Sequence, residues 1–427
     1  MKYLLNILIV AFLVSCSQTN NRPELKWNLP AVEFDRVDFT VSIILPDDLE
    51  PGKKALKLVE TTGKTEKEVP CQLHINDNNH YTLNWIAEGR TIAGEVRAYE
   101  LFLVNEMDVK SPVEISRNDS SLIVLKEGNP VLQYRHSLLP APAGQSQLFE
   151  RSGFIHPLYS PSGEELTWVQ PPDHYHHVGL WNPWTKVTWK GNHTDFWNLG
   201  SGQGTVRFSD FLYIENGPVF AEFSVLQDHI AFMPPKPAEN DVEYMGDEVI
   251  VIEEEWKIRV WNIQDGFMID FTSLVRNIMD VPISLDAYRY GGGIGYRATA
   301  KWNRDNSYVL TSEGKTRQEA DATRAKWCWI YGDLEGVNTG LLFMSDTINY
   351  DYPQQMRVWP ANMNKEGYQF FEFTPIREKA WVLQPEETYS QKYRIWVKEG
   401  DVDARMAELQ WLQYVNNTEE KISYLSK

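Results

Sequence analysis

The sequence predicts a mostly β protein, with a small N-terminal β-sandwich module, a large antiparallel two-sheet sandwich and a short C-terminal helix. Three observations lead to this prediction. Apolar and polar residues alternate in the first hundred residues, the long stretch over 120–400 reads as strands and turns, and helical spacing begins only after residue 400. So long a run of strands without helices between them excludes a parallel α/β fold.

The first sixteen residues predict a lipoprotein signal peptide (1–16). A cationic start is followed by an apolar run, Leu4–Val14, which is too short to span a bilayer as a helix. The run ends in a lipobox-like segment before Cys16, so we expect lipidation of Cys16. An ordinary secretory signal with an incidental cysteine is the alternative. Residues 17–24 then form a polar tether, and the protein is expected to be lipid-anchored, facing the periplasm or at the outer membrane of a Gram-negative bacterium.

Residues 25–115 predict the N-terminal module, for which we expect an immunoglobulin-like sandwich. Val37–Ile43 alternates cleanly between apolar and polar residues, Tyr99–Val104 does so in part, and turn-rich pieces lie between them. Ser111-Pro112 and Asn118–Ser120 mark the boundary to the large domain, which we place at 120–400.

Two hairpins are predicted inside the large domain. Val249–Trp261 and Phe267–Thr272 flank the turn Gln264–Gly266, and Phe211–Ile214 and Val219–Val225 flank Asn216–Pro218. A further strand is expected at Thr339–Met344. Residues 401–427 predict the helix and tail. The helix is expected to be capped by Asp401 and to face inward with Val402, Met406, Leu409 and Trp411 or Leu412.

Composition narrows the function classes. The chain has 41 basic and 59 acidic side chains and a net charge of −18, which argues against nucleic acid because a phosphate backbone needs a basic footprint. Aromatic residues make up 13% of the chain, and they can either stack on sugars or fill sheet interfaces. After Cys16, only Cys71 and Cys328 remain, and these either pair or are two buried thiols.

The segment Asp173–Trp181 is the strongest candidate for chemistry, because three of the nine histidines lie within it. If the segment is extended, His174 and His176 point to one face and His177 to the other. The pair can act in acid–base chemistry or hydrogen bonding to substrate, or it can ligate a divalent metal together with His193 or Asp195. A structural role is the third alternative, and no cofactor is certain.

Several motifs carry a resemblance to a known family. They are the histidine segment, Arg151–Glu164, Asp195–Trp197, Gly293–Arg297 and Arg357–Pro360. Together they resemble the bacterial secreted proteins labelled "methane oxygenase PmoA-like" over about 120–400. A true methane oxygenase subunit crosses the membrane many times, and we find no such segment after the signal, so we interpret the label as a misnomer. The family is similar to galactose-mutarotase-like carbohydrate enzymes, which implies a β-supersandwich.

The candidate site residues follow from the histidines and from this resemblance. Tyr296 and Arg297 come after a glycine run that lets the backbone approach a ligand, although a β-bulge is the alternative. Glu372 lies between two phenylalanines and is either a general base or a solvated residue. The catalytic candidates are His174, His176, His177, Tyr296 and Glu372, and the substrate-binding candidates are Arg297, Trp181, Trp184, Trp197, Arg324 and His156.

Other charged and polar residues are expected to be solvated. Glu253 and Glu255 are expected on one solvent-exposed face of a strand, and His74, His80 and His229 at the surface. We therefore expect a carbohydrate-active enzyme with histidine-centred acid–base chemistry, in which hydrolysis, elimination and epimerisation remain open. The alternative is a non-catalytic glycan-binding lipoprotein of a polysaccharide-utilisation system, with Trp181, Trp184, Trp189 and Trp197 as a stacking platform.

Overall fold

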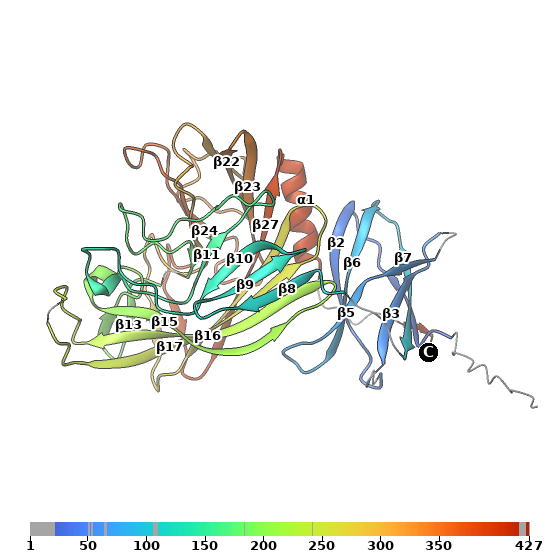
Figure 1. Ribbon diagram of the computed structural model, residues 1–427, viewed down its shortest axis with the longest axis horizontal. Coiled ribbons are helices and arrows are strands. Elements are labelled where there is room, and N and C mark those ends of the chain that lie inside the picture. Colours follow the sequence, from blue (N-terminus) through green and yellow to red (C-terminus); the bar gives the residue numbers. More distant parts are fainter. Residues whose placement is uncertain are drawn as a thin grey trace, which may run out of the picture.

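The computed structural model describes residues 22–49, 52, 54–63, 66–105, 110–182, 184–240, 242–417 and 424–426. The predicted signal peptide and lipidated Cys16 lie outside the described residues. The predicted fold class is confirmed, because the described chain consists of antiparallel sheets and one α-helix, α1 (Ala404–Val415). Figure 1 shows the N-terminal strands at one end of the molecule, the large sandwich at the other, and α1 between them.

The N-terminal strands form two sheets that enclose their own core. The rings of Trp27, Trp85 and Tyr99 pack there at centroid distances of 5.0–5.9 Å. The chain returns to this region near residue 425, because β28 (Tyr424–Ser426) pairs with β1 (Leu25–Leu29). The sheets have the orders β28-β1-β7-β3-β4 and β2-β6-β5, with β1 (Leu25–Leu29), β2 (Arg36–Ile44), β3 (Ala55–Glu60), β4 (Lys67–Val69), β5 (Cys71–Ile75), β6 (Tyr81–Thr91), β7 (Arg97–Val104) and β28 (Tyr424–Ser426).

Two eight-stranded sheets build the large sandwich around one apolar core. The first has the order β24-β25-β20-β12-β11-β10-β9-β8, with β8 (Val113–Arg117), β9 (Ser121–Lys126), β10 (Asn129–Arg135), β11 (Phe154–Leu158), β12 (Leu180–Trp181), β20 (Gly295–Arg297), β24 (Gln355–Val358) and β25 (Phe370–Thr374). The second has the order β15-β16-β17-β18-β27-β23-β22-β21, with β15 (Gly204–Glu215), β16 (Phe220–Met233), β17 (Asp247–Trp261), β18 (Phe267–Asn277), β21 (Ser307–Thr311), β22 (Trp327–Leu334), β23 (Val337–Ser345) and β27 (Thr388–Glu399). A small sheet, β14-β13-β19-β26, covers a separate apolar cluster and contains β13 (Val187–Trp189), β14 (Asn192–Thr194), β19 (Ile283–Leu285) and β26 (Trp381–Leu383).

Both predicted hairpins are confirmed, as β15–β16 and β17–β18, and the strand expected at Thr339–Met344 lies within β23. The helix is present, but its predicted cap is wrong. Asp403 caps α1 by accepting a hydrogen bond from Met406 N at 2.7 Å, whereas Asp401 accepts one from Asn338. Met406 is exposed, and Ala407 and Trp411 form the buried face.

Both remaining cysteines are free thiols. Cys71 is partly buried on β5, and Cys328 is fully buried on β22 in a different sheet. Burial raises the pKa of both thiols, that of Cys71 to about 12, so neither is a reactive thiolate at neutral pH. Among the helices of the described chain, none is long and apolar enough to cross a membrane.

Candidate functional site

Two consecutive turns, rather than a strand, shape the segment before β12. His174 N donates to Pro171 O at 2.9 Å, and His177 N donates to His174 O at 3.0 Å. The predicted separation of the histidines onto two faces is therefore wrong, because a turn does not alternate side chains as a strand does. The ring of His174 lies 4.7 Å from that of His177 and 5.5 Å from that of His176, so the three imidazoles form one cluster.

The cluster runs from the surface into the protein. The side chain of His174 is 36% exposed, His176 is half-buried and His177 is buried. Burial lowers the pKa of His176 to about 3 and that of His177 well below its ordinary value. Both rings are therefore neutral at physiological pH and can exchange hydrogen bonds without carrying charge.

An ion pair holds the outer edge of the cluster. Arg297 Nη2 donates to both carboxylate oxygens of Asp173, at 2.8 and 2.7 Å, and His174 Nδ1 lies 3.2 Å from Asp173 Oδ2 in a contact that falls short of hydrogen-bond geometry. Burial acts to raise the pKa of Asp173, but the contacts with His174 and Arg297 outweigh it and lower this pKa to about 2. Asp173 is therefore a carboxylate that orients the His174 ring.

Aromatic rings frame this ion pair. The Arg297 guanidinium lies 5.0–5.5 Å from the ring centroids of Trp168, Trp359 and Tyr368, and Trp359 Nε1 donates to the Tyr290 hydroxyl at 3.2 Å. Trp168, Tyr290 and Tyr368 are partly exposed, whereas Trp359 is buried. None of the four was a predicted site residue. Only Tyr290 carried a signal in the sequence, because it directly precedes the glycine run Gly291–Gly293.

The predicted tryptophan platform is not at the surface. Trp181 and Trp197 are buried, and they pack against His177 at centroid distances of 5.3 and 5.6 Å. Trp184 and Trp189 are also buried, in the separate cluster under the small sheet. These four rings are therefore the interior support of the site and of the small sheet, and they offer no exposed stacking face.

Glu372 is completely buried, so the solvated alternative for this residue is wrong. Its Oε1 accepts a hydrogen bond from Gly291 N at 2.6 Å, whereas its Oε2 has no partner among the described residues. Burial raises the pKa of Glu372 well above its ordinary value, so it is a neutral carboxylic acid. Strand alternation places it on the same side of β25 as Phe370, whose ring packs on His177.

The other predicted site residues make contacts of their own. Tyr296 faces the sandwich core, where its hydroxyl donates to Leu166 O at 2.6 Å. His156 Nδ1 lies 2.9 Å from the Thr167 hydroxyl, and Arg324 forms ion pairs with Asp351 and Glu378 at 3.0 and 3.1 Å.

The predicted metal ligands are not assembled as a set. His193 lies on the hairpin β13–β14, where its Nδ1 is 2.8 Å from the Thr188 hydroxyl. In the part of the chain that the structure describes, no group of three histidine, cysteine or acidic side chains is arranged to hold a metal ion. The role of His174 and His176 as metal ligands stays a prediction.

A second buried polar group was missed by sequence reasoning. Glu254 is buried on β17, and its carboxyl oxygens lie 2.7 Å from His229 Nε2 and 2.7 Å from Trp256 Nε1. His229 was expected at the surface, and that expectation is wrong because the residue is fully buried. The neighbouring Glu253 and Glu255 retain side-chain exposures of 30% and 22%, so the outward face was assigned correctly.

Comparisons with known proteins place the chain in a wider context. No curated protein matches it. Among solved structures, it is similar to a galactose mutarotase related enzyme from Lactobacillus acidophilus, at 11% identity over 67% of this chain and 97% of that chain, with a TM-score of 0.29. The Slr1438 protein from Synechocystis sp. PCC 6803 matches at 10% identity over 69% and 98%, with a TM-score of 0.32. An Escherichia coli K12 protein, named provisionally as an aldose 1-epimerase, matches at 7% over 67% and 98%, with a TM-score of 0.30.

Two of these three structures are named for a mutarotase-related or epimerase activity, and all three resemblances are distant and specify no activity for this chain. A family model described as "Family of unknown function (DUF6807)" matches residues 121–412. The matched range includes the histidine cluster, Arg297, Glu372 and most of α1.

Proposed function

This chain belongs to DUF6807, a family of unknown function, and we propose that this member is a carbohydrate-active enzyme whose proton-transfer residue is His174. The substrate is a sugar or glycoside, and the reaction is a hydrolysis, an elimination or an epimerisation. One observation carries the proposal: a partly exposed imidazole contacts the carboxylate of Asp173 and adjoins a neutral imidazole, and the Arg297 guanidinium that holds this carboxylate is bordered by the partly exposed rings of Trp168 and Tyr368.

His174 is the histidine best suited to exchange a proton with a substrate. Its side chain is 36% exposed, and the contact of its Nδ1 with Asp173 leaves Nε2 to face a ligand. The buried guanidinium of Arg297 holds Asp173 in place and makes Arg297 a positioning residue. His176 is neutral, so its part is to donate or accept a hydrogen bond from a hydroxyl.

A carbohydrate fits the surroundings of His174. The partly exposed rings of Trp168, Tyr290 and Tyr368 are suited to the apolar face of a pyranose. Some buried donors also lack a hydrogen-bond partner among the described residues: Arg297 Nε and Nη1, and Nε of Arg357, whose guanidinium lies 4.9 Å from the Tyr290 ring. Such donors favour a ligand that accepts hydrogen bonds, and sugar hydroxyls do so.

The test compares His174→Asn with His80→Asn. His80 is a close match, because its Nδ1 also lies 3.2 Å from an aspartate and its side chain is 35% exposed, but it belongs to the N-terminal module. The assays follow anomer and epimer interconversion by NMR, release of reducing ends, and the ultraviolet absorbance of unsaturated products over a panel of sugars and glycosides. We expect His174→Asn to lower turnover by about 100-fold or more and His80→Asn to leave it unchanged.

A glycan-binding protein without turnover is the second candidate, because the same partly exposed rings would bind a sugar in either case. If the wild type binds a glycan on the panel but converts none, and His174→Asn changes the affinity by less than about threefold, the enzyme proposal fails and the binding function replaces it.

We also propose that Cys16 carries the lipid that attaches the protein to the membrane. The support is the sequence alone: an apolar run ends at this cysteine and a polar segment follows. Cells expressing the wild type, Cys16→Ala or Cys71→Ala would be labelled with an alkyne fatty acid and fractionated. Labelling and membrane association are expected to disappear only in Cys16→Ala, and their persistence in that variant would refute the anchor.

A further inference from the structure

A cleft with a volume of about 630 Å³ lies between the N-terminal strands and the outer face of the large sandwich, away from the His174 site. Its walls come from β2 and β5 on one side and from β16, β17, β18 and β27 on the other, and the end of α1 lines it as well. None of the lining residues belongs to the His174 site. The volume falls within the range of small-molecule sites, about 300–1,000 Å³.

The floor of the cleft carries an alternating row of charges. Glu222, Arg259, Asp270 and Arg394 are direct cross-strand neighbours on β16, β17, β18 and β27. Arg259 Nε donates to Glu222 Oε2 at 2.5 Å, and Arg394 Nη2 donates to Asp270 Oδ2 at 2.8 Å. Tyr213 donates to the other oxygen of Glu222 at 2.6 Å. The charges of this row are therefore neutralised within the protein.

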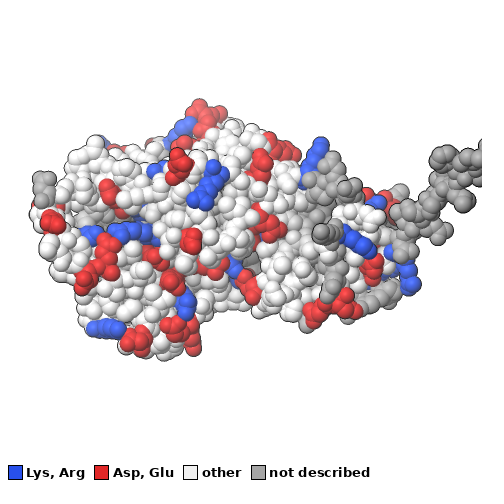
Figure 2. Space-filling model, turned by 60° about the horizontal axis from the view of Figure 1, so that its bottom comes forward, with Lys and Arg blue, Asp and Glu red and all other residues white. Residues whose placement is uncertain are grey.

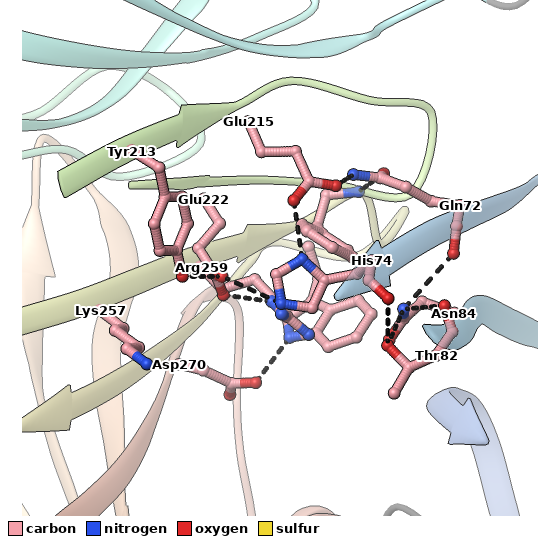
Figure 3. A network of polar contacts seen from close by, with 12 residues as sticks. Gln72, His74, Thr82, Asn84, Tyr213, Glu215, Glu222, Lys257, Arg259 and Asp270 are labelled. Atoms are coloured by element: carbon pink, nitrogen blue, oxygen red, sulfur yellow. Dashed lines mark hydrogen bonds and ion pairs between the residues drawn. The ribbon is translucent and has the colours of Figure 1, made fainter. Parts of the chain in front are cut away.

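Polar contacts between the two parts of the chain hold the walls of the cleft together (Figure 3). His74 on β5 lies 2.7 Å from Glu215 through Nδ1 and 3.6 Å from Glu222 through Nε2. Gln72 donates to Glu215 at 2.6 Å and accepts a hydrogen bond from Phe220 N at 3.1 Å. Because these bonds cross between the two parts, the shape of the cleft is preorganised.

Beside this row lie polar groups that have no hydrogen-bond or ion-pair partner among the described residues. Thr272 is the cross-strand neighbour of both Lys257 and Lys392, and the exposed Lys392 ammonium forms no ion pair with the described residues. On the opposite wall, Ser42 is 6% exposed and its hydroxyl has no hydrogen-bond partner in the described chain. The hydroxyl of Ser390 on β27 also lacks one. Buried hydroxyls without a partner are uncommon, and both serines line the cleft.

The mixture of charges points to the chemical class of that ligand. The cleft is lined by four carboxylates (Asp77, Glu222, Asp270 and Asp346) and four permanent cations (Lys257, Arg259, Lys392 and Arg394). Because the two signs alternate, an anion bound to a cation of the cleft would also lie near a carboxylate, and a cation bound to a carboxylate would lie near another cation. A neutral hydroxyl, in contrast, can donate to the carboxylates and accept from the cations. Acidic and basic side chains are also interspersed, rather than separated by sign, on the face shown in Figure 2.

We propose that this cleft is a second binding site, and that it takes a neutral oligosaccharide. Hydroxyl groups of the ligand contact Ser42, Thr272 and Lys392, and its apolar faces pack against Leu274 and Tyr414, which also line the cleft. The site is independent of chemistry at His174, since the two share no residue.

The test is isothermal titration calorimetry of the detergent-solubilised full-length protein. The probes are cellotetraose, xylotetraose, maltotetraose and β-1,4-galactotetraose, with tetragalacturonate as the charged comparison. Thr272→Trp fills the cleft, and Thr388→Trp is its control, because Thr388 is an exposed threonine on β27 outside the cleft. We expect Thr272→Trp to weaken binding of at least one neutral probe by about tenfold or more, with Thr388→Trp unchanged.

His174→Asn separates this site from the proposed active site. Heat of binding that survives His174→Asn but is lost in Thr272→Trp supports the cleft, whatever the result for turnover. If Thr272→Trp fails to fold by circular dichroism, Lys392→Met takes its place, because it removes an exposed ammonium without adding bulk. The proposal is overturned if the cleft variant weakens the binding of none of the neutral probes. It is also overturned if tetragalacturonate is the one probe whose binding the cleft variant weakens.

Discussion

Arg297 is fully buried, and it forms an ion pair with Asp173, whose side chain is 28% exposed. The two residues are therefore unequal partners. If the carboxylate is removed, a guanidinium remains in the interior with its charge uncompensated, whereas water can solvate the carboxylate if the guanidinium is removed. The pair thus supports both the fold and the orientation of His174.

We expect Asp173→Ala to lower the free energy of unfolding by about 3 kcal/mol, because it leaves Arg297 buried and unpaired. Arg297→Met should cost less than Asp173→Ala. Urea unfolding measures both, and Asp47→Ala is the control, since Asp47 pairs with His80 at 3.2 Å but is 83% exposed. If Asp173→Ala costs no more than Asp47→Ala, the ion pair does not stabilise the fold.

The stability of the protein should fall in acid through its buried histidines. Burial lowers the pKa of His156 to about 4, below the value of about 6.5 in an unfolded chain. As the pH falls from about 6.5 to about 4, the unfolded state takes up a proton that the folded state does not, which costs about 1.4 kcal/mol of stability per pH unit.

His156→Gln removes that titration. Between about pH 6.5 and pH 4.5, urea unfolding should therefore show a loss of stability that is roughly 2–3 kcal/mol smaller in His156→Gln than in the wild type. Parallel pH profiles for the two proteins would contradict the assignment of a neutral, buried imidazole at this position.

The strands were predictable because their signals are local. The hairpin β17–β18 follows from two alternating runs and the turn Gln264–Gly266 between them. The pairing of β28 with β1 was not predictable in this way, because its partners lie at opposite ends of the chain. The helix cap was misplaced for the same reason, since Asp401 bonds to Asn338, a residue far away in sequence.

The location of the site was predictable, whereas its geometry was not. A dense group of histidines indicated where to look, but whether their rings meet depends on the backbone. Pro171-Pro172-Asp173 is a turn signal that precedes them, and it competes with the strand interpretation. Trp359 and Tyr368 come from distant parts of the chain, so nothing near the histidines indicates them. His229 and Glu254 meet through the pairing of β16 with β17, which a single sequence does not reveal.

Glu372→Gln distinguishes a catalytic carboxylate from a buried neutral acid. Burial raises the pKa of Glu372 well above its ordinary value, so its contribution to stability is complete below pH 4.5 and is lost as the pH rises toward its folded pKa. The amide cannot ionise, so Glu372→Gln should be at least as stable as the wild type at neutral pH. Above neutral pH, the stability of Glu372→Gln should depend less on pH than that of the wild type. Thermal unfolding from acid to alkaline pH measures this. A loss of activity by about 100-fold or more in a folded Glu372→Gln protein would instead identify Glu372 as a general base.

Glu254 and Glu253 are neighbours on β17, and the same substitution should destabilise the protein far more at Glu254 than at Glu253. Glu254 accepts hydrogen bonds from Asn182, Ser273 and Trp256 and contacts His229, all in the interior. Glu254→Ala leaves these groups without an acceptor and should cost about 3–5 kcal/mol.

Glu253→Ala removes only a partly exposed carboxylate that lies 3.5 Å from Arg276, so it should cost less than about 1 kcal/mol. Urea unfolding of the two variants measures the difference, and circular dichroism checks that each is folded at the start. Equal costs would mean that the buried network contributes no more than a surface ion pair. A large cost confined to Glu254 would show that the support of the sandwich beneath Asn182, the residue that follows β12, depends on this one buried carboxyl group.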